Sequence, residues 1–272
     1  FLFAYILLVF LNPIQAAEAL RTLDAKVYHL GTPGFPEWEE FAKSKAHGRR
    51  LDITFDAEPN AKPQTLLIRQ RQVKARWPVL LNNQRIGYLL NIESKLVHSI
   101  AVPAGKLRAG KNTMSIVAPK TTDDIEVGPI QLTAVAEAQL FAAPLTVSVA
   151  DAKTANAIPC RITVVNEDGA LATLRPAPNQ QLAYRPGVVY VSSGAARLNL
   201  LPGQYTIYAS RGFEYSVAKQ NVSVNAGKTA HVQLALRHEV PTPGLIATDT
   251  HIHTLTRSGH GDSTEVERMH TI

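Results

Sequence analysis

The feature that most constrains the fold of this chain is a long succession of short apolar runs separated by turn signals. The runs recur at a spacing of roughly ten residues and are rich in Val, Ile, Thr and Leu, which is typical of strands. Turn formers such as Asn82-Asn83 and Asn166-Glu-Asp168-Gly169 lie between them and favour hairpins. Many short strands at this spacing predict a mainly β protein built from sandwiches.

The first predicted domain, residues 20–140, is a β-sandwich of the jelly-roll type. Its strands are expected at Leu51–Phe55, Thr65–Arg71, Trp77–Leu81, Arg85–Leu90, Val97–Val102, Asn112–Val117 and Ile125–Thr133. The stretch from Pro36 to Lys45 is a candidate helix, or a loop that carries Trp38.

The second predicted domain, residues 145–239, follows an Ala-rich hinge and is also all-β. Its strands are expected at Thr146–Val149, Arg161–Asn166, Val188–Val191, Ala196–Leu200, Gln204–Tyr208, Tyr215–Val224 and Thr229–Leu236. Residues 170–187 contain prolines and glutamines and are interpreted as a long inserted loop. A loop of that length is unusual unless it is functional or disordered.

One short segment of the second domain, Arg211-Gly-Phe213-Glu214-Tyr215, interrupts the strand pattern. It is open to two interpretations. It is a loop aimed at a neighbouring active site or domain, or it is a local Arg–Glu pair with an aromatic corner. The sequence does not separate them.

The first nineteen residues predict export. Phe1 to Leu11 is almost wholly apolar, and Ala17-Glu18-Ala19 matches an A-x-A cleavage pattern. Residues 1–19 are therefore interpreted as a signal peptide whose start is missing, which places the protein in the periplasm or outside the cell. The run is too short to span a bilayer, and no later stretch is a candidate span, so we expect no stable membrane span. Cys160 is the only cysteine, which excludes an internal disulfide and favours a small buried residue.

The charge balance of +6 raises the question of a polyanionic partner. Arg69, Arg71, Lys74 and Arg76 form the densest basic run, but no interleaved aromatic set accompanies them. We therefore expect no nucleic-acid partner.

Three aromatic residues of the first domain raise the possibility of a glycan partner: Trp38, Trp77 and Tyr88. Either they form a carbohydrate-binding surface, or they lie in the core of the sandwich. We favour the core, because aromatics at strand spacing are usually buried.

The strongest chemical signal follows a Pro-rich linker, Glu239 to Gly244, which marks a domain boundary. An apolar strand is expected at Leu245–Thr250, and Asp249, His251 and His253 alternate along it, so their side chains share one face. Two imidazoles on one face are what a metal ion needs.

The loop after this strand adds two further candidates, His260 between two glycines and Asp262. Asp262 and Glu265 have the spacing of a capping box that opens a helix, so Asp262 is either a helix cap or a metal ligand. Asp249 is interpreted as an acceptor that orients an imidazole rather than as a ligand. The candidate metal ligands are thus His251, His253, His260 and Asp262, and Asp249 is the candidate residue that orients an imidazole.

Three resemblances accompany these patterns. "RWPVLLNNQRIGYL" with "IAVPAGKLRAGKNTMSIVA" resembles the galactose-binding-like jelly rolls of extracellular hydrolases, and the strand from Leu201-Pro-Gly203 resembles carboxypeptidase regulatory-like, prealbumin-type sandwiches. "DTHIHTLTRSGHGDSTEVERMHTI" resembles the first motif of the polymerase and histidinol phosphatase (PHP) superfamily, and in particular its CehA/McbA metallohydrolase branch. The order of sandwich, "RGFEY", Pro-linker and "DTHIHT" is similar to that branch as well.

The PHP resemblance implies an irregular α/β barrel that begins at residues 245–272 and holds divalent metal ions, either Zn, Mn or Fe. It implies hydrolysis of a small-molecule ester, carbamate or phosphoester by a metal-activated water. His251 and His253 match the paired ligands of the first motif, and His260 matches the Asp/His position that follows Ser258 in this motif. The later motifs of the family have no counterpart in this sequence, so we expect an incomplete and inactive site in these residues.

The leading interpretation is that the chain is the N-terminal part of an exported metal-dependent hydrolase. Two other functions are alternatives to it. The first is a β-sandwich protein that binds carbohydrate or a cell-surface partner, with the His cluster as a metal-loaded tail. The second is a purely structural spacer.

Overall fold

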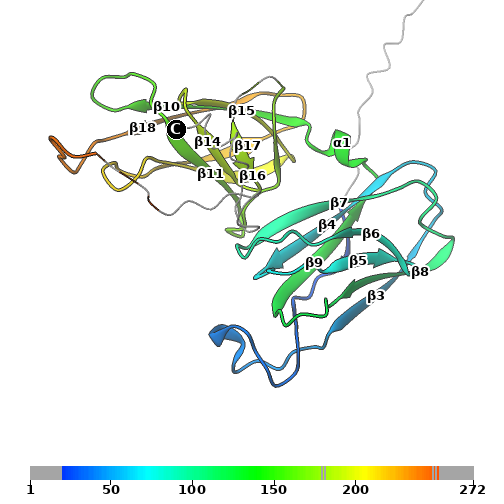
Figure 1. The fold of residues 1–272 in the computed structure, drawn as a ribbon. Helices are drawn as coiled ribbons and strands as arrows, with labels where there is room; N and C mark the ends of the chain where they lie inside the picture. The colour runs from blue at the N-terminus through cyan, green and yellow to red at the C-terminus, as the bar shows by residue number, and fades with distance from the viewer. Residues whose placement is uncertain (1–19, 179, 181, 247, 249, 251–272) are drawn as a thin grey trace, which may run out of the picture.

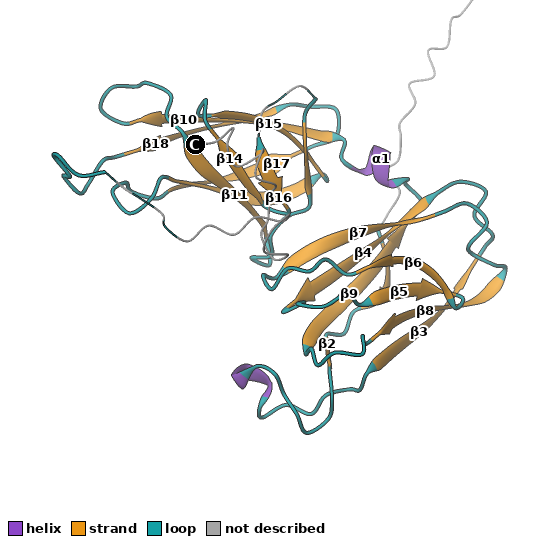
Figure 2. Cartoon of the chain, viewed as in Figure 1, coloured by secondary structure: helices purple, strands orange, loops and turns teal. Residues whose placement is uncertain are grey.

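The computed structural model describes residues 20–178, 180, 182–246, 248 and 250, and it shows a mainly β protein of two β-sandwiches (Figure 1). Helix is limited to the short α1, Glu137–Leu140, and the 3₁₀ helix η1, Glu39–Phe41 (Figure 2). The predicted signal peptide lies outside the described residues. No helix among the described residues is long and apolar enough to cross a membrane.

The first sandwich consists of two antiparallel sheets that pack face to face. One sheet has the order β1-β9-β4-β7, with β2 also on β9, and the other has the order β3-β8-β5-β6. The strand bounds are β1 Arg21–Asp24, β2 Tyr28–Leu30, β3 Arg50–Ala57, β4 Gln64–Arg71, β5 Pro78–Leu81, β6 Gln84–Tyr88, β7 Leu96–Val102, β8 Gly110–Val117 and β9 Ile125–Thr133.

Strand β3 shows why these residues form a sandwich. Leu51, Ile53 and Phe55 are buried, while the residues between them, Asp52 and Thr54, are exposed. This alternation follows from the two-residue period of a strand with one face on the core. The inward residues join the apolar core of the first sandwich, together with Trp77 and side chains of β4, β5, β8 and β9.

The second sandwich has sheets of order β12-β15-β10-β18 and β13-β14-β11-β16-β17. Its strand bounds are β10 Ala143–Asp151, β11 Cys160–Asn166, β12 Leu174–Pro176, β13 Ala183–Arg185, β14 Val188–Val191, β15 Ala195–Leu200, β16 Gly203–Ser210, β17 Ala218–Val224 and β18 Ala230–Leu236. Strands β10 and β18 pair in parallel, whereas the other pairs are antiparallel.

Two local predictions for the second domain were wrong. Residues 170–187 are not a single inserted loop, because they contain β12 and β13. The strand predicted from Tyr215 begins only at Ala218, because Tyr215 and Ser216 instead pair with residues that follow β18.

The two sandwiches meet along the edge strand β7 (Figure 1). Leu171 of the second sandwich forms a parallel bridge with Leu96 of β7: its N–H donates to Lys95 O at 2.8 Å, and its carbonyl accepts from Val97 N at 3.3 Å. Leu96, Leu171 and Val188 form a small buried cluster of their own. The second sandwich thus adds a short piece of backbone to an edge of the first.

Polar side chains extend this junction on both sides. Asp168 accepts a hydrogen bond from Arg69, and its carbonyl accepts from Lys95 Nζ at 2.9 Å. Glu137 of α1 accepts from Ser99 Oγ of β7 at 2.7 Å and from Arg175 of β12 at 2.8 Å. Backbone pairing, apolar packing and ion pairs thus occur together at this one interface.

Candidate functional site

The predicted metal residues lie outside the described residues. Asp249, His251, His253, His260 and Asp262 therefore have no described geometry, and the metal site stays a prediction. Within the part of the chain that the structure describes, no group of three His, Cys, Asp or Glu side chains could hold a metal ion.

The linker that precedes the predicted metal segment is described. Leu245 N donates to Thr242 O at 3.1 Å, closing a turn, and Gly244 adopts a φ of +74°. Leu245 and Ile246 belong to no strand and are exposed at 73% and 90%. The strand predicted at Leu245–Thr250 is therefore absent at its described start, because no neighbouring strand pairs with it there.

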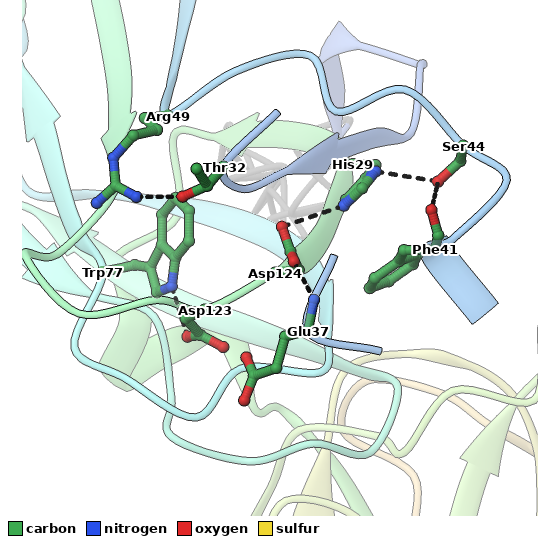
Figure 3. Close-up of polar contacts among 9 residues, drawn as sticks. All are labelled: His29, Thr32, Glu37, Phe41, Ser44, Arg49, Trp77, Asp123 and Asp124. Carbon is green, nitrogen blue, oxygen red and sulfur yellow. Dashed lines mark hydrogen bonds and ion pairs between the residues drawn. The ribbon is translucent and has the colours of Figure 1, made fainter. Parts of the chain in front are cut away.

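The most developed polar cluster of the described residues lies at one end of the first sandwich, around Asp123 and Asp124 (Figure 3). Both carboxylates are buried, at 1% and 0% exposure. Asp123 Oδ2 accepts hydrogen bonds from Trp77 Nε1 at 2.7 Å, Ala75 N at 2.9 Å and Lys74 N at 3.2 Å. It thereby fixes both the indole of Trp77 and the turn before β5.

Asp124 ties the loop after β2 to the same end. Its Oδ2 accepts from Glu37 N at 2.5 Å, and its Oδ1 lies 3.3 Å from His29 Nε2 (Figure 3). The His29 ring stacks on Phe41 with centroids 4.3 Å apart. Gly31 leaves the space that Asp124 occupies, since a Cβ at this position would lie 1.3 Å from Asp124 Oδ1.

Burial and hydrogen bonding act in opposite directions on the carboxyl group of Asp123. Burial raises the pKa of its carboxyl above the ordinary value, although the three hydrogen bonds to Oδ2 act in the opposite direction. Asp123 Oδ1 is buried and has no hydrogen-bond partner among the described residues. The cluster is a closed structural element that holds two loops on a sandwich end.

The three aromatic residues proposed for glycan binding are engaged within the protein. Trp77 is completely buried in the core, so it offers no face to a sugar. The guanidinium groups of Arg76 and Arg85 lie 4.2 Å and 5.0 Å from the centroid of the Tyr88 ring. Lys74 Nζ lies 3.8 Å from the centroid of the Trp38 ring. Of the two interpretations, the core is correct for Trp77.

The basic run of β4 and the following turn is likewise paired. Arg69 contacts Asp168, Arg71 contacts Glu40 and Glu126, and Lys74 contacts Glu37. These cations stabilise loops and the junction between the sandwiches.

Burial strongly shifts the pKa values of three groups, Cys160, His98 and Tyr205. Burial raises the pKa of the Cys160 thiol to about 12, so the thiolate is scarce at neutral pH and the residue is a poor nucleophile. Burial lowers the pKa of His98 on β7 to about 4. His98 Nε2 lies 3.2 Å from Tyr88 O.

The segment Arg211-Gly-Phe213-Glu214-Tyr215 forms a loop anchored to the residues after β18. Glu214 lies 3.2 Å from His238 Nε2 and makes no ion pair with Arg211, whose Nη1 donates to Pro159 O at 2.7 Å. The Tyr215 ring packs on His238 with centroids 4.9 Å apart. The prediction of a local Arg–Glu pair is therefore wrong. The predicted aromatic corner is present, and Tyr215 forms it with His238. Phe213, between these anchors, is fully exposed at 103%.

Sequence reasoning missed the junction between the sandwiches, which includes a shallow groove of about 330 Å³ lined by Glu137, Ala138, Phe141, Arg175 and Asn199. Arg175 stacks over Phe141, with its guanidinium carbon 4.9 Å from the ring centroid. The apolar dipeptide Ala170-Leu171 within the supposed loop was the available signal, since exposed loops are usually polar.

No family model matches this chain, and no curated protein matches it. Among solved structures, it is similar to the Bacillus anthracis TIE protein, with 14% identity, 78% of this chain and 40% of that chain covered, and a TM-score of 0.27. The group B streptococcus pilus 2b backbone protein matches at 12% identity, 70% and 92% coverage and a TM-score of 0.25. The shaft pilin SpaA from Lactobacillus rhamnosus GG matches at 14% identity, 83% and 100% coverage and a TM-score of 0.28.

These TM-scores are too low to assign the chain to the fold of any of these proteins, and the chain spans less than half of the TIE protein. The two-sandwich architecture rests on the strand pairing described above.

Proposed function

We propose that the described residues form a rigid, non-catalytic unit of two sandwiches in an exported protein. This unit would either act at a cell surface or hold a further segment of the protein in place. The junction on β7 carries this proposal. Leu171 is paired to the backbone of β7, and Glu137 links Ser99 of one sandwich to Arg175 of the other. A flexible spacer would need none of these contacts.

Small-angle scattering on the 272-residue chain tests the rigid unit. Leu171 belongs to the junction cluster and to neither main core. Leu171→Asp should therefore separate the sandwiches and raise the radius of gyration while both remain folded. Phe35→Asp, at a position that is 72% exposed, is the matched control. An unchanged radius in folded Leu171→Asp would contradict the proposal.

A binding role at a cell surface fits the same architecture, and its glycan form can be tested on Trp38. Trp38 is only partly buried, whereas Trp77 is fully buried. Trp77→Ala would perturb the core and report nothing about binding. Glycan-array binding that is lost in Trp38→Ala would support carbohydrate recognition, and binding that persists would exclude this ring from it.

The second candidate function is metal-dependent hydrolysis, for which the His-rich segment at residues 249–262 is the specific observation. His251, His253, His260 and Asp262 would hold a divalent ion, and Asp249 would orient an imidazole. A bound ion there would supply a water of lowered pKa for attack on an ester, carbamate or phosphoester bond. The described sandwiches would then support a domain of the PHP type.

Metal analysis and ester turnover test this second function. We expect the 272-residue chain to bind Zn²⁺ or Mn²⁺ weakly and to be inactive, because the PHP resemblance implies further ligands from later motifs that these residues do not contain. A chain extended at its C-terminus should turn over esters and lose that activity in His251→Ala. Ester turnover by the 272 residues alone would show that the later motifs are not needed.

A further inference from the structure

The end of the second sandwich from which the linker leaves carries most of the exposed apolar side chains of the described residues. Five of the eight large ones are found on the Phe213 loop and the linker: Phe213, Val217, Val240, Leu245 and Ile246. Both segments lie at the left-hand end of this sandwich in Figure 1. Large apolar side chains gathered at one place on a surface mark an interaction site.

The loop that presents Phe213 is held firmly. Glu214 O accepts hydrogen bonds from Glu239 N at 2.8 Å and Val240 N at 3.2 Å, and Ser216 N donates to Arg237 O at 2.9 Å. The backbone that follows Phe213 is therefore bonded to the start of the linker, and before Phe213 the Arg211 side chain donates through Nη1 to Pro159 O at 2.7 Å. An aromatic side chain that is fully exposed on an anchored loop is preorganised for a partner.

The chain itself contains a candidate partner for this surface. It leaves through the exposed Leu245 and Ile246 and continues into residues 251–272, which contain Ile252, Leu255, Val266, Met269 and Ile272. The linker starts beside Phe213, because Val240 N donates to Glu214 O, and each residue of extended chain after it spans about 3.3–3.6 Å. A tethered segment also binds at a high effective concentration, whereas a second copy would need a much larger complementary surface than these five side chains offer.

We propose that residues 251–272 dock on the surface formed by Phe213, Val217 and Val240. This deepens the proposed function, because the docked segment carries the predicted metal ligands, and the rigid two-sandwich unit would hold that segment in one place. Docking itself requires no metal. The Phe213 loop is thus the part of the second sandwich aimed at the neighbouring segment.

Photo-crosslinking identifies the occupant directly. A p-benzoylphenylalanine at position 213 of the 272-residue chain preserves the aromatic side chain. After irradiation and digestion, we expect crosslinked peptides from residues 251–272 within monomeric protein. The same residue at position 35 is the matched control, since Phe35 is 72% exposed but belongs to the first sandwich. A crosslinked dimer, or no crosslink to residues 251–272, would overturn the proposal.

Hydrogen exchange provides a second measurement. Phe213→Ser with Val217→Ser should speed exchange in peptides of residues 251–272 by about fivefold or more, because a docked segment is protected and a free one is not. Phe35→Ser should leave those peptides unchanged, and equal exchange in all three proteins would contradict docking. A Zn²⁺ titration separates this inference from the hydrolase proposal: docking without metal binding rejects only the metal site, and metal binding without docking rejects only this inference.

Discussion

The Asp123–Asp124 end of the first sandwich and the Phe213 end of the second differ in how they place an aromatic side chain. At the Asp123–Asp124 end of the first sandwich, the buried carboxylates accept hydrogen bonds from an indole and from backbone donors, and Trp77 has no exposed surface. At the Phe213 end of the second sandwich, hydrogen bonds fix the loop but the aromatic side chain stays in solvent. The first arrangement is typical of structure and the second of interaction. Aromatic residues in similar loop positions thus have different roles, which mutation can separate.

The largest effect is expected from Trp77→Ala. The substitution removes a fully buried indole from the core and leaves Asp123 without one of its three donors. The free energy of unfolding should fall by about 3–5 kcal/mol. Urea unfolding followed by circular dichroism measures this. A loss below about 1 kcal/mol would show that the closed end does not depend on the indole.

The pH dependence of stability should separate the groups that burial affects. His98 has a pKa of about 4 in the folded protein, against an ordinary value of 6.5. Between these values the unfolded chain takes up a proton that the native protein does not, so stability falls as the pH is lowered, by up to about 3 kcal/mol. The contribution of Asp123 has the opposite sign, because its pKa is raised and the folded state binds the proton more readily.

Unfolding at pH 7 and pH 4.5 measures this difference. In His98→Gln, whose amide can still donate to Tyr88 O, the acid loss should be smaller than in the wild type. In Asp123→Asn it should be larger, since the opposing contribution is gone. Identical pH profiles in all three proteins would show that neither group is linked to folding.

A smaller effect is expected from Gly31→Ala. The new Cβ would fall on Asp124 Oδ1 and force the carboxylate away from Glu37 N and His29. Overpacking of this kind costs about 1–3 kcal/mol. Gly203→Ala is the matched control, because its Cβ would meet nothing closer than 3.5 Å. Equal midpoints of thermal unfolding for the two variants would contradict the tight fit at the closed end.

The sequence predicted elements whose signal is local. The strand predicted at Val97–Val102 is β7, Leu96–Val102, and that at Thr65–Arg71 is β4, Gln64–Arg71. Both were visible because buried apolar residues recur along a short stretch bounded by turn formers.

The sequence did not predict what depends on distant partners. The pairing of Leu171 with Leu96 and the parallel contact of β10 with β18 join residues far apart in the chain, and no local pattern encodes them. The same limit applies to Asp123 and Asp124. Their carboxylates organise the closed end through partners far away in the chain, Trp77 and Glu37. The metal residues His251 and His253 stay predictions from a motif.

The smallest and most discriminating effect concerns Phe213. In a chain ending at Ile246, Phe213→Ser should change the free energy of unfolding by no more than about 0.5 kcal/mol, because the side chain touches solvent. In the 272-residue chain the same substitution should cost about 0.5–1 kcal/mol more, which is the coupling between Phe213 and residues 251–272. Phe35→Ser should show no such difference between the two chains. If Phe213→Ser lowers the free energy of unfolding equally in both chains, residues 251–272 do not bind at Phe213. The exposed end of the second sandwich would then be an interaction site only for a partner outside this sequence.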